Sequence, residues 1–384
     1  MATEITQDQI NEFRMNRHFL TSRATVSELE SLVEQVCGIQ AQMPAAANLQ
    51  LWARTENLKP SDIFDALWNS KTLIRTWCMR GTAHYLPTLQ FPAYLKAIIE
   101  PHIPRHTEWL AKRGMREFGE IAKMDPLQHD FEAILSAVTS ALSDGPATRE
   151  DVATVVAEQV GPEARPWVDT GYYIVTKLLA YEGKVCFGPD LGGKATLVLT
   201  EQWLSKQPPV EQGIAEDRIL SSYLCSYGPA TPQDFSAWSG LKMTRIKPIW
   251  KRNNEHLCEV ILNENSLWIL EQDLEALLNS KGGSSPVRLL PHFDVFLLGH
   301  KDKSHLVDEV HYKQVFKKAA WIAPVLLCNG RAIGIWKQKR TTKNLVVSIE
   351  PFITLTKSQV NDIEAETQRL GDFFELAYEV QLLA

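Results

Sequence analysis

The sequence predicts an α+β fold in which three units of similar order are followed by a β-rich C-terminal region. Helix-capping residues introduce pairs of helices three times along the 384 residues, and turns between β-type apolar runs follow each pair. The tail after about residue 276 is richer in β-type runs. The expected segments are three units at 1–90, 131–205 and 206–275, a helical connector at 91–130, and the β-rich region with a terminal helix at 276–384.

The first unit is expected to contain two helices and a hairpin. Thr25–Glu28 (TVSE) has the pattern of a capping box, and apolar residues repeat on one helical face behind it. A second helix is expected to begin near Ser61–Asp62. Two β-type runs at 73–77 and 82–86 then flank Arg80–Gly81, which predicts the hairpin.

The second unit repeats this order. Thr148 is expected to cap a helix that ends at Gly161–Pro162, and a second helix is expected over Pro166–Tyr181. Two β-type runs at 185–187 and 195–199 follow, separated by a glycine-rich stretch.

Two motifs, one in this unit and one before it, have the residue spacing of known binding sites. Gly188–Lys194 has the spacing of a phosphate-binding loop, but Ala195 stands where a hydroxyl residue would hold magnesium, so a hairpin tip is predicted. His102 and His106 are four residues apart, but Pro104 between them opposes a helical pair of metal ligands. Neither motif therefore predicts a site.

The third unit is the clearest. Thr231–Asp234 (TPQD) supplies an N-cap hydroxyl, a proline at the first helical position and an acid in the first turn, and the helix is expected to stop at Gly240. The segment 242–254 presents cations on a second helix, and runs at 259–262 and 266–270 predict a hairpin. Helix, helix, hairpin is the order of a winged helix, whose second helix usually reads DNA. Three units in series predict a DNA-binding protein.

The C-terminal region is expected to contain a tight hairpin and a final helix. Val325–Cys328 and Ala332–Trp336 surround Asn329–Gly330, and this dipeptide is typical of a type I′ turn. An amphipathic helix is expected from near Ser358.

The net charge of −6 does not by itself favour binding to phosphates, but the charges are unevenly distributed. Residues 242–254 and 329–343 contain several lysines and arginines and no acid. A basic groove on an acidic body is one interpretation of these runs, and solvated faces of ordinary elements are the other.

Composition also limits the compartment and the chemistry. No apolar run approaches the ~20 residues of a membrane span, and the first residues lack the pattern of a secretory signal. The six cysteines form no CxxC pair and no zinc-ligand spacing, so we expect buried, reduced thiols. The sequence thus predicts a cytoplasmic protein without membrane, metal or cofactor, and no serine, cysteine or lysine stands out as an activated nucleophile.

Two glutamines form the most unusual local pattern. Gln40 and Gln42 are separated by the small residue Ala41, follow a helix stop and precede Pro44. In an extended backbone both side chains would project to one side, since side chains alternate along a strand. The alternative is that they are ordinary loop glutamines, hydrogen-bonded to backbone or water.

These glutamines belong to a set of ordered motifs. The motifs are Gly38–Gln42 (GIQAQ), Arg75–His84 (RTWCMRGTAH), Tyr227–Gly240 (YGPATPQDFSAWSG), Leu289–Gly299 (LLPHFDVFLLG) and Gly330–Trp336 (GRAIGIW). Together they resemble the AlkZ/YcaQ superfamily of winged-helix DNA glycosylases over essentially the whole chain. The resemblance implies three tandem winged helices and a β-rich C-terminal part around a concave DNA-binding face.

The resemblance also implies a site. One branch of the superfamily has two glutamines around an apolar residue, and the other ends that motif in aspartate. Because it has Gln42 at this position, the chain resembles the AlkZ branch, which removes bulky adducts and interstrand crosslinks. This resemblance implies that Gln40 and Gln42 are the catalytic pair. Cys78 departs from the pattern, which has proline there, and Tyr85 after His84 departs as well.

Two further groups of residues are candidates for the site. His292 and Asp294 are expected either to tie down a turn or to lie on the DNA-binding face and orient DNA or the glutamines. The candidate phosphate contacts are Arg75, Arg80, Lys242, Arg245, Lys251, Arg252, Lys337 and Arg340.

The chemistry that fits two amides is the hydrolysis of an N7-alkylated purine. Such a base is cationic and leaves as a neutral molecule, so no general acid is needed, unlike in an ordinary glycoside. Carboxamides can orient the attacking water. We therefore expect a monomeric, monofunctional glycosylase that acts on alkylated bases in double-stranded DNA. The alternative is a non-catalytic winged-helix DNA-binding protein, such as a transcriptional regulator.

Overall fold

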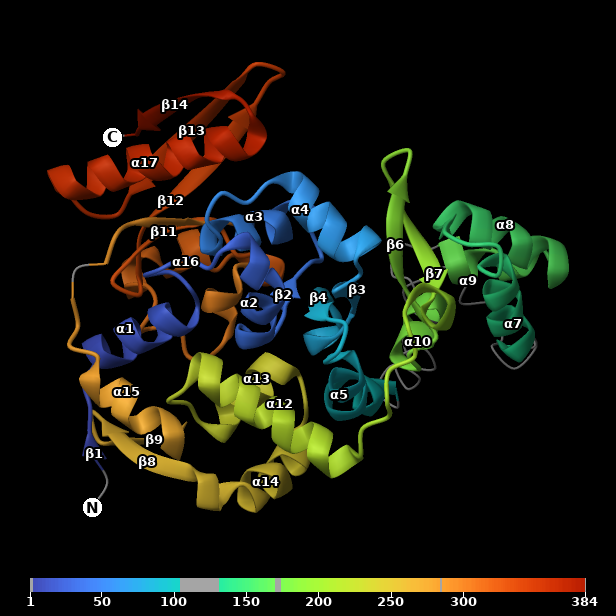
Figure 1. Ribbon diagram of the computed structural model, residues 1–384, viewed down its shortest axis with the longest axis horizontal. Helices are drawn as coiled ribbons and strands as arrows, with labels where there is room; N and C mark the ends of the chain where they lie inside the picture. Colours follow the sequence, from blue (N-terminus) through green and yellow to red (C-terminus); the bar gives the residue numbers. More distant parts are fainter. Residues whose placement is uncertain (1–2, 104–130, 170–173, 284, 384) are drawn as a thin grey trace. The chain divides into compact units, whose positions relative to one another are not determined.

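The computed structural model describes residues 3–103, 131–169, 174–283 and 285–383. The chain forms two compact units, one of residues 1–65 with 217–384 and the other of residues 66–216. Both contain helices and strands, which confirms the predicted α+β class (Figure 1). None of the helices in the described ranges is long and apolar enough to cross a membrane.

The N-terminal part of the larger unit is mainly helical. The capping box at Thr25–Glu28 is confirmed, although it opens a short 3-10 turn that continues into the α2 helix. The elements are α1 (Gln7–Arg17), η1 (Val26–Glu28), α2 (Leu29–Gln35), β2 (Ile39–Gln40), α3 (Pro44–Arg54) and α4 (Pro60–Phe64). α4 begins one residue before the start expected from Ser61–Asp62. α1 and α3 were not predicted from the sequence.

The next part of this unit contains the clearest predicted order. Its elements are α12 (Gln212–Tyr227), α13 (Pro232–Ser239), α14 (Met243–Arg252), β8 (Leu257–Leu262), β9 (Asn265–Leu270) and α15 (Leu274–Asn279). The part of α12 from Asp217 onward belongs to the larger unit. The Thr231 hydroxyl accepts from the Asp234 amide, and Gly240 ends α13 with a φ of 79°. β8 pairs antiparallel with β9 and parallel with β1 (Thr3–Glu4).

The C-terminal region is a five-stranded sheet with one long helix. Its strands, in spatial order, are β10 (Arg288–Leu290), β11 (Val325–Cys328), β12 (Arg331–Arg340), β13 (Asn344–Pro351) and β14 (Ala377–Leu382). Asn329 and Gly330 have φ values of 49° and 75°, which confirms the predicted tight turn between β11 and β12. α17 (Lys357–Phe374) covers this sheet, and it begins where a helix was expected (Figure 1).

The smaller unit carries two hairpins and a group of helices. Its strands are β3 (Leu73–Trp77), β4 (Ala83–Pro87), β5 (Ala147–Thr148), β6 (Val185–Leu191) and β7 (Lys194–Leu199). Its longer helices are α7 (Phe131–Ala141), α8 (Arg149–Gln159) and α10 (Ile174–Tyr181), with short α5 (Phe91–Tyr94), α9 (Pro166–Asp169) and α11 (Thr200–Trp203). The glycine-rich stretch forms the tip of the β6–β7 hairpin, with Gly192 and Gly193 at positive φ, as predicted.

The predicted order of two helices and a hairpin is found without interruption at α13, α14, β8 and β9. In the first segment β2 and α3 lie between the two expected helices, and in the second segment α9 and α10 form the described part of the second expected helix. Order alone does not define a winged helix. The tandem winged-helix arrangement therefore stays a prediction, as do the five proposed segments. His106 and most of the connector, residues 104–130, lie outside the described residues, and so do residues 170–173 of the helix expected over Pro166–Tyr181.

Candidate functional site

The glutamine segment is introduced by a sharp reversal of the chain after α2. Cys37 and Gly38 have φ values of 60° and 86°, in the left-handed region that glycine adopts without strain. Their amides donate to the carbonyls of Glu34 and Val33, at 3.0 and 2.8 Å, and so close the helix end. β2 then carries Gln40, and Pro44 begins α3 four residues later.

The two glutamines have different surroundings. Gln40 is only 7% exposed, and its Oε1 has no hydrogen-bond partner among the described residues. Gln42 is exposed and lies in a bend between β2 and α3. The extended backbone that was expected through both residues ends at Gln40. One side chain is therefore buried with an unpaired acceptor oxygen, and the other is exposed.

Gln50, on the buried face of α3, holds the backbone of the glutamine segment. Its Nε2 donates to the Gln40 carbonyl oxygen at 3.1 Å, and its Oε1 accepts from the Val295 amide at 3.2 Å. The Gln50 side chain is completely buried. A single buried carboxamide thus joins the segment that carries Gln40 to the turn that follows Asp294.

An ion pair between Arg54 and Asp294 locks the same arrangement. Arg54 Nη1 and Nη2 donate to the two carboxylate oxygens at 2.8 and 2.6 Å, and both side chains are 0% exposed. Arg54 Nη1 also donates to the Gln50 carbonyl at 3.1 Å. Asp294 Oδ1 accepts from the Phe296 amide at 3.0 Å, so the carboxylate caps the short helix η10 (Val295–Leu298) as well. Asp294 therefore ties down a turn, which was one of its two expected roles.

His292 lies in a different environment. Its Nδ1 lies 2.9 Å from the Ile322 carbonyl, and its ring packs edge-on against Trp321 with centroids 4.9 Å apart. Burial lowers the pKa of His292, which favours the neutral ring. These contacts join His292 to the segment before β11, and a role toward DNA stays a prediction.

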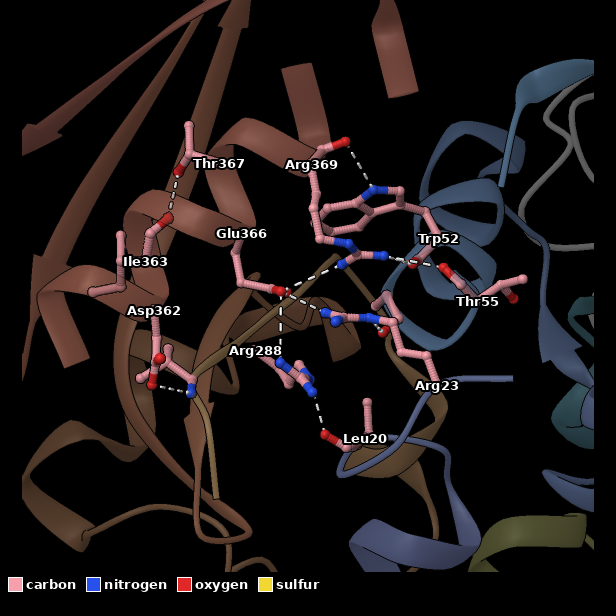
Figure 2. A network of polar contacts seen from close by, with 12 residues as sticks. Leu20, Arg23, Trp52, Thr55, Arg288, Asp362, Ile363, Glu366, Thr367 and Arg369 are labelled. Carbon is pink, nitrogen blue, oxygen red and sulfur yellow. Dashed lines mark hydrogen bonds and ion pairs between the residues drawn. The ribbon is translucent and has the colours of Figure 1, made fainter. Parts of the chain in front are cut away.

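The C-terminal end of α3 is held by a cluster of three arginines around one buried carboxylate (Figure 2). Glu366 of α17 pairs with Arg23, with Arg288 at 3.6 Å and with Arg369 at 3.3 Å. Arg369 Nη2 also donates to the carbonyls of Trp52 and Thr55, at 3.3 and 3.0 Å. α17 therefore fixes the end of the helix whose other end follows the glutamines.

Four of the candidate phosphate contacts lie on or next to α14. Ile246, Ile249 and Trp250 bury one face of this helix, which leaves its cations on the outer side. Lys242 and Lys251 are exposed and form no hydrogen bond or ion pair with the described residues. Arg245 is half-buried, and Arg252 is paired with Asp217 through contacts of 2.6 and 2.9 Å.

The other four candidates differ in accessibility. Arg75 of β3 is 7% exposed, and its guanidinium lies 4.1 Å from the centre of the Phe187 ring. Arg80 is half-buried in the turn between β3 and β4, with a φ of 54°. Lys337 and Arg340 are exposed on β12, and Arg340 lies over the Phe374 ring at 4.1 Å. Burial leaves Arg75 less available to a phosphate than Lys337.

The comparisons with known proteins extend over nearly the whole chain. The family model described as DNA glycosylase AlkZ-like matches residues 33–373. A curated relative, the interstrand DNA cross-link repair glycosylase of Streptomyces sahachiroi, is 29% identical over 381 residues, covering 94% of this chain and 95% of that protein. The chain belongs to the AlkZ-like DNA glycosylase family. The solved structure of Streptomyces sahachiroi DNA glycosylase AlkZ superimposes with a TM-score of 0.81 at 25% identity, covering 99% of this chain and all of that one.

Membership of the AlkZ-like family confirms the resemblance inferred from the motifs, and it makes DNA the substrate. The matched range includes every residue predicted for the site, from Gln40 to Arg340. Sequence reasoning did not find Gln50, Arg54 or Glu366, although all three support the helix that follows the glutamines.

One lysine of the smaller unit was also missed. Lys177 Nζ donates to the Gly81 carbonyl at 2.6 Å, and burial lowers the pKa of Lys177 to about 8. A lowered pKa makes an amine a better nucleophile at neutral pH. The cysteines show the opposite effect, since burial raises the pKa of the Cys37, Cys78, Cys186, Cys225 and Cys328 thiols.

Proposed function

We propose that this chain hydrolyses the N-glycosidic bond of cationic N7-alkylpurines in duplex DNA, with Gln40 and Gln42 positioning the attacking water. The expected substrates are bulky adducts and interstrand crosslinks. The name of the Streptomyces relative, a cross-link repair glycosylase, supports this substrate class. Family membership supports the reaction type.

In this reaction the main task of the protein is to position the attacking water. The bond between C1′ and N9 breaks, and the electron pair stays on the base and neutralises its positive charge. Water supplies the hydroxyl of the abasic sugar and releases its other proton to the solvent. Because the leaving base needs no proton, no general acid is required. Positioning the water in this way lowers the activation free energy by several kcal/mol, which corresponds to a rate increase of about 10²- to 10³-fold.

The observation that carries the proposal is the unpaired Oε1 of buried Gln40. A buried carbonyl oxygen without a partner is unfavourable, so a structure retains one where a ligand or water completes it. Its backbone is fixed through Gln50 and the Arg54–Asp294 pair, which suits a group that must hold a water in one place. Gln42, exposed one residue beyond Ala41, would reach the same water from the solvent side.

The test uses a duplex with one bulky N7-alkylguanine and a matched duplex with a bulky adduct on an exocyclic nitrogen, which leaves the base uncharged. After incubation with the full chain, alkaline cleavage reveals abasic sites. We expect excision only from the cationic adduct. Since carboxamides do not titrate near neutrality, the rate should change little between about pH 6 and 8. Equal excision of the neutral adduct, or tight binding of the N7 adduct without any base release, contradicts the proposal.

The reaction is also proposed to stop at the abasic site. Without alkali the strand should remain intact, and borohydride should trap no covalent complex. Lys177 provides the control, because its lowered pKa makes it the described lysine most suited to form a Schiff base. Trapping that disappears in Lys177→Gln would show a lyase activity and contradict this part of the proposal.

A further inference from the structure

A cavity of about 760 Å³ in the larger unit lies apart from the glutamine segment. It is bounded by α1, the start of α13, the β8–β9 turn and the loop at 300–305. Neither Gln40 nor Gln42 lines it. Its volume is within the range of about 300–1,000 Å³ that is typical of sites for small molecules. The charged and titratable residues that line it are Arg14, Asp234, His300, Lys301, Asp302 and His305.

Arg14 places in the wall of this cavity a cation that forms no ion pair with the described residues. It is 6% exposed, and its Nε and Nη2 donate to the carbonyls of Tyr227 and Pro229 at 3.1 and 2.7 Å. Among the described residues it has no ion-pair partner, and none accepts a hydrogen bond from Nη1. Burial lowers the pKa of Arg14 to about 10, so it remains charged at neutral pH. A buried charge bonded only to neutral groups is unfavourable until an anion compensates it.

Two histidines add unsatisfied ring nitrogens beside Arg14. His300 and His305 lie with ring centroids 5.0 Å apart, and His300 Nδ1 and His305 Nε2 are buried without a hydrogen-bond partner. His300 Nε2 lies 2.9 Å from the Tyr227 carbonyl, so this nitrogen carries the proton. In the neutral state, His300 Nδ1 can accept from a hydroxyl and His305 Nε2 can donate to an oxygen.

The other charges of the cavity compensate Arg14 only in part, since Asp234 attracts it electrostatically but forms no hydrogen bond or ion pair with it in the described part of the chain. Lys301 is exposed at its rim. Asp234 accepts from the Lys301 amide at 2.8 Å and from the Thr231 amide at 3.0 Å, and Asp302 accepts from the Ser304 amide at 2.9 Å. Both carboxylates are thus already bonded to groups of the protein. An anion in contact with the guanidinium would complete the compensation of Arg14, and an oxygen would satisfy His305 Nε2.

We propose that this cavity binds the phosphate group of an anionic ligand, with Arg14 compensating its charge and His305 and Lys301 donating to its oxygens. A phosphate has the charge and the several acceptor oxygens that these groups lack, and arginine is well suited to it. The phosphate belongs either to a free ester of nucleotide size or to a DNA strand. The inference is independent of the proposed reaction, because it concerns other residues and is tested by binding.

The experiment is isothermal titration calorimetry of the full chain with adenosine 5′-monophosphate, with inorganic phosphate and with uncharged adenosine. The two phosphates should bind and adenosine should not. Arg14→Gln should abolish the binding, but it also removes contacts to the 227–229 carbonyls. Lys301→Gln and His305→Asn therefore provide milder variants, each expected to weaken binding about tenfold, or about 1.4 kcal/mol. Lys313→Gln, an exposed lysine outside the cavity, is the matched control and should leave binding unchanged.

A second arm distinguishes the two sources of phosphate. Duplex DNA is titrated into the same variants at several salt concentrations. If neither small phosphate binds, but Lys301→Gln weakens duplex binding and flattens its salt dependence relative to Lys313→Gln, the phosphate belongs to DNA. If Lys301→Gln and His305→Asn, both folded, match the wild type with every probe, the proposal is overturned. Loss of base excision has no bearing on either arm, so failure of the glycosylase proposal is distinguished from failure of this one.

Discussion

Two arginine–aspartate pairs of the larger unit have nearly the same contact distances and opposite surroundings. Arg54 and Asp294 are joined by contacts of 2.6 and 2.8 Å, and both side chains are 0% exposed. Arg252 and Asp217 are joined by contacts of 2.6 and 2.9 Å, with side chains 42% and 36% exposed. The first pair supports the helix next to the glutamines, and the second lies at the end of the basic helix α14.

The difference shows that burial, rather than bond length, decides what such a pair does. A buried pair holds its elements in place, because either partner left alone would be an uncompensated charge in the interior. An exposed pair is solvated whether or not it forms, so it contributes little stability and mainly reduces the charge presented to DNA. The candidate reaction needs a fixed group, while phosphate binding needs only accessible charge.

The largest expected effect comes from breaking the buried pair. Asp294→Asn should lower the free energy of unfolding by about 3–5 kcal/mol, because Arg54 would keep its charge without a partner. Asp217→Asn, the matched exposed change, should lower it by no more than about 1 kcal/mol. Urea denaturation of the two variants measures both values. Similar losses in the two variants would show that burial does not separate the pairs.

The next effect concerns Gln50. Gln50→Met keeps the side-chain volume but leaves the Gln40 carbonyl and the Val295 amide unpaired, at a loss of about 1–3 kcal/mol of stability. Because the Gln40 backbone loses a support, the single-turnover excision rate should fall roughly tenfold, with unchanged affinity for adducted DNA. A fall in DNA affinity that explains the whole loss would contradict the positioning role.

The smallest effect concerns α14. Lys251→Gln should reduce the slope of log K against log salt by about 0.9, the value for one phosphate contact. Arg252→Gln should reduce it by less, since Asp217 already neutralises this cation, and Asp217→Asn should strengthen binding. Fluorescence anisotropy with duplex DNA at several salt concentrations measures the slopes. Equal slopes for Lys251→Gln and wild type would remove Lys251 from the proposed phosphate contacts.

Helix caps and tight turns were predicted correctly from the sequence, because the residues that form them are neighbours along the chain. The cap at Thr231–Asp234 and the turn at Asn329–Gly330 each lie within four residues, and both occur where expected. α3 was missed because its N-cap, Met43, makes no side-chain hydrogen bond, so that Pro44 at the first helical position was left without the capping residue that accompanies Pro232.

The supports of the candidate site could not be predicted from the sequence, since their partners are distant along the chain. Arg54 and Asp294 are 240 residues apart, and Arg23 and Glu366 are 343 apart. A single sequence indicates that an arginine is present but not which carboxylate it meets. Asp294 was therefore singled out by its motif, while its partner Arg54 was not.

The most direct test of the central claim is the single-turnover excision rate on duplex DNA with one bulky N7-alkylguanine. Gln40→Met and Gln42→Met remove the polar atoms at nearly constant volume, and Gln202→Met makes the same change at an exposed position of α11. The account predicts rates about 100-fold or more below wild type for the first two, with normal folding, and an unchanged rate for Gln202→Met. Excision at the wild-type rate by both Gln40→Met and Gln42→Met would contradict it.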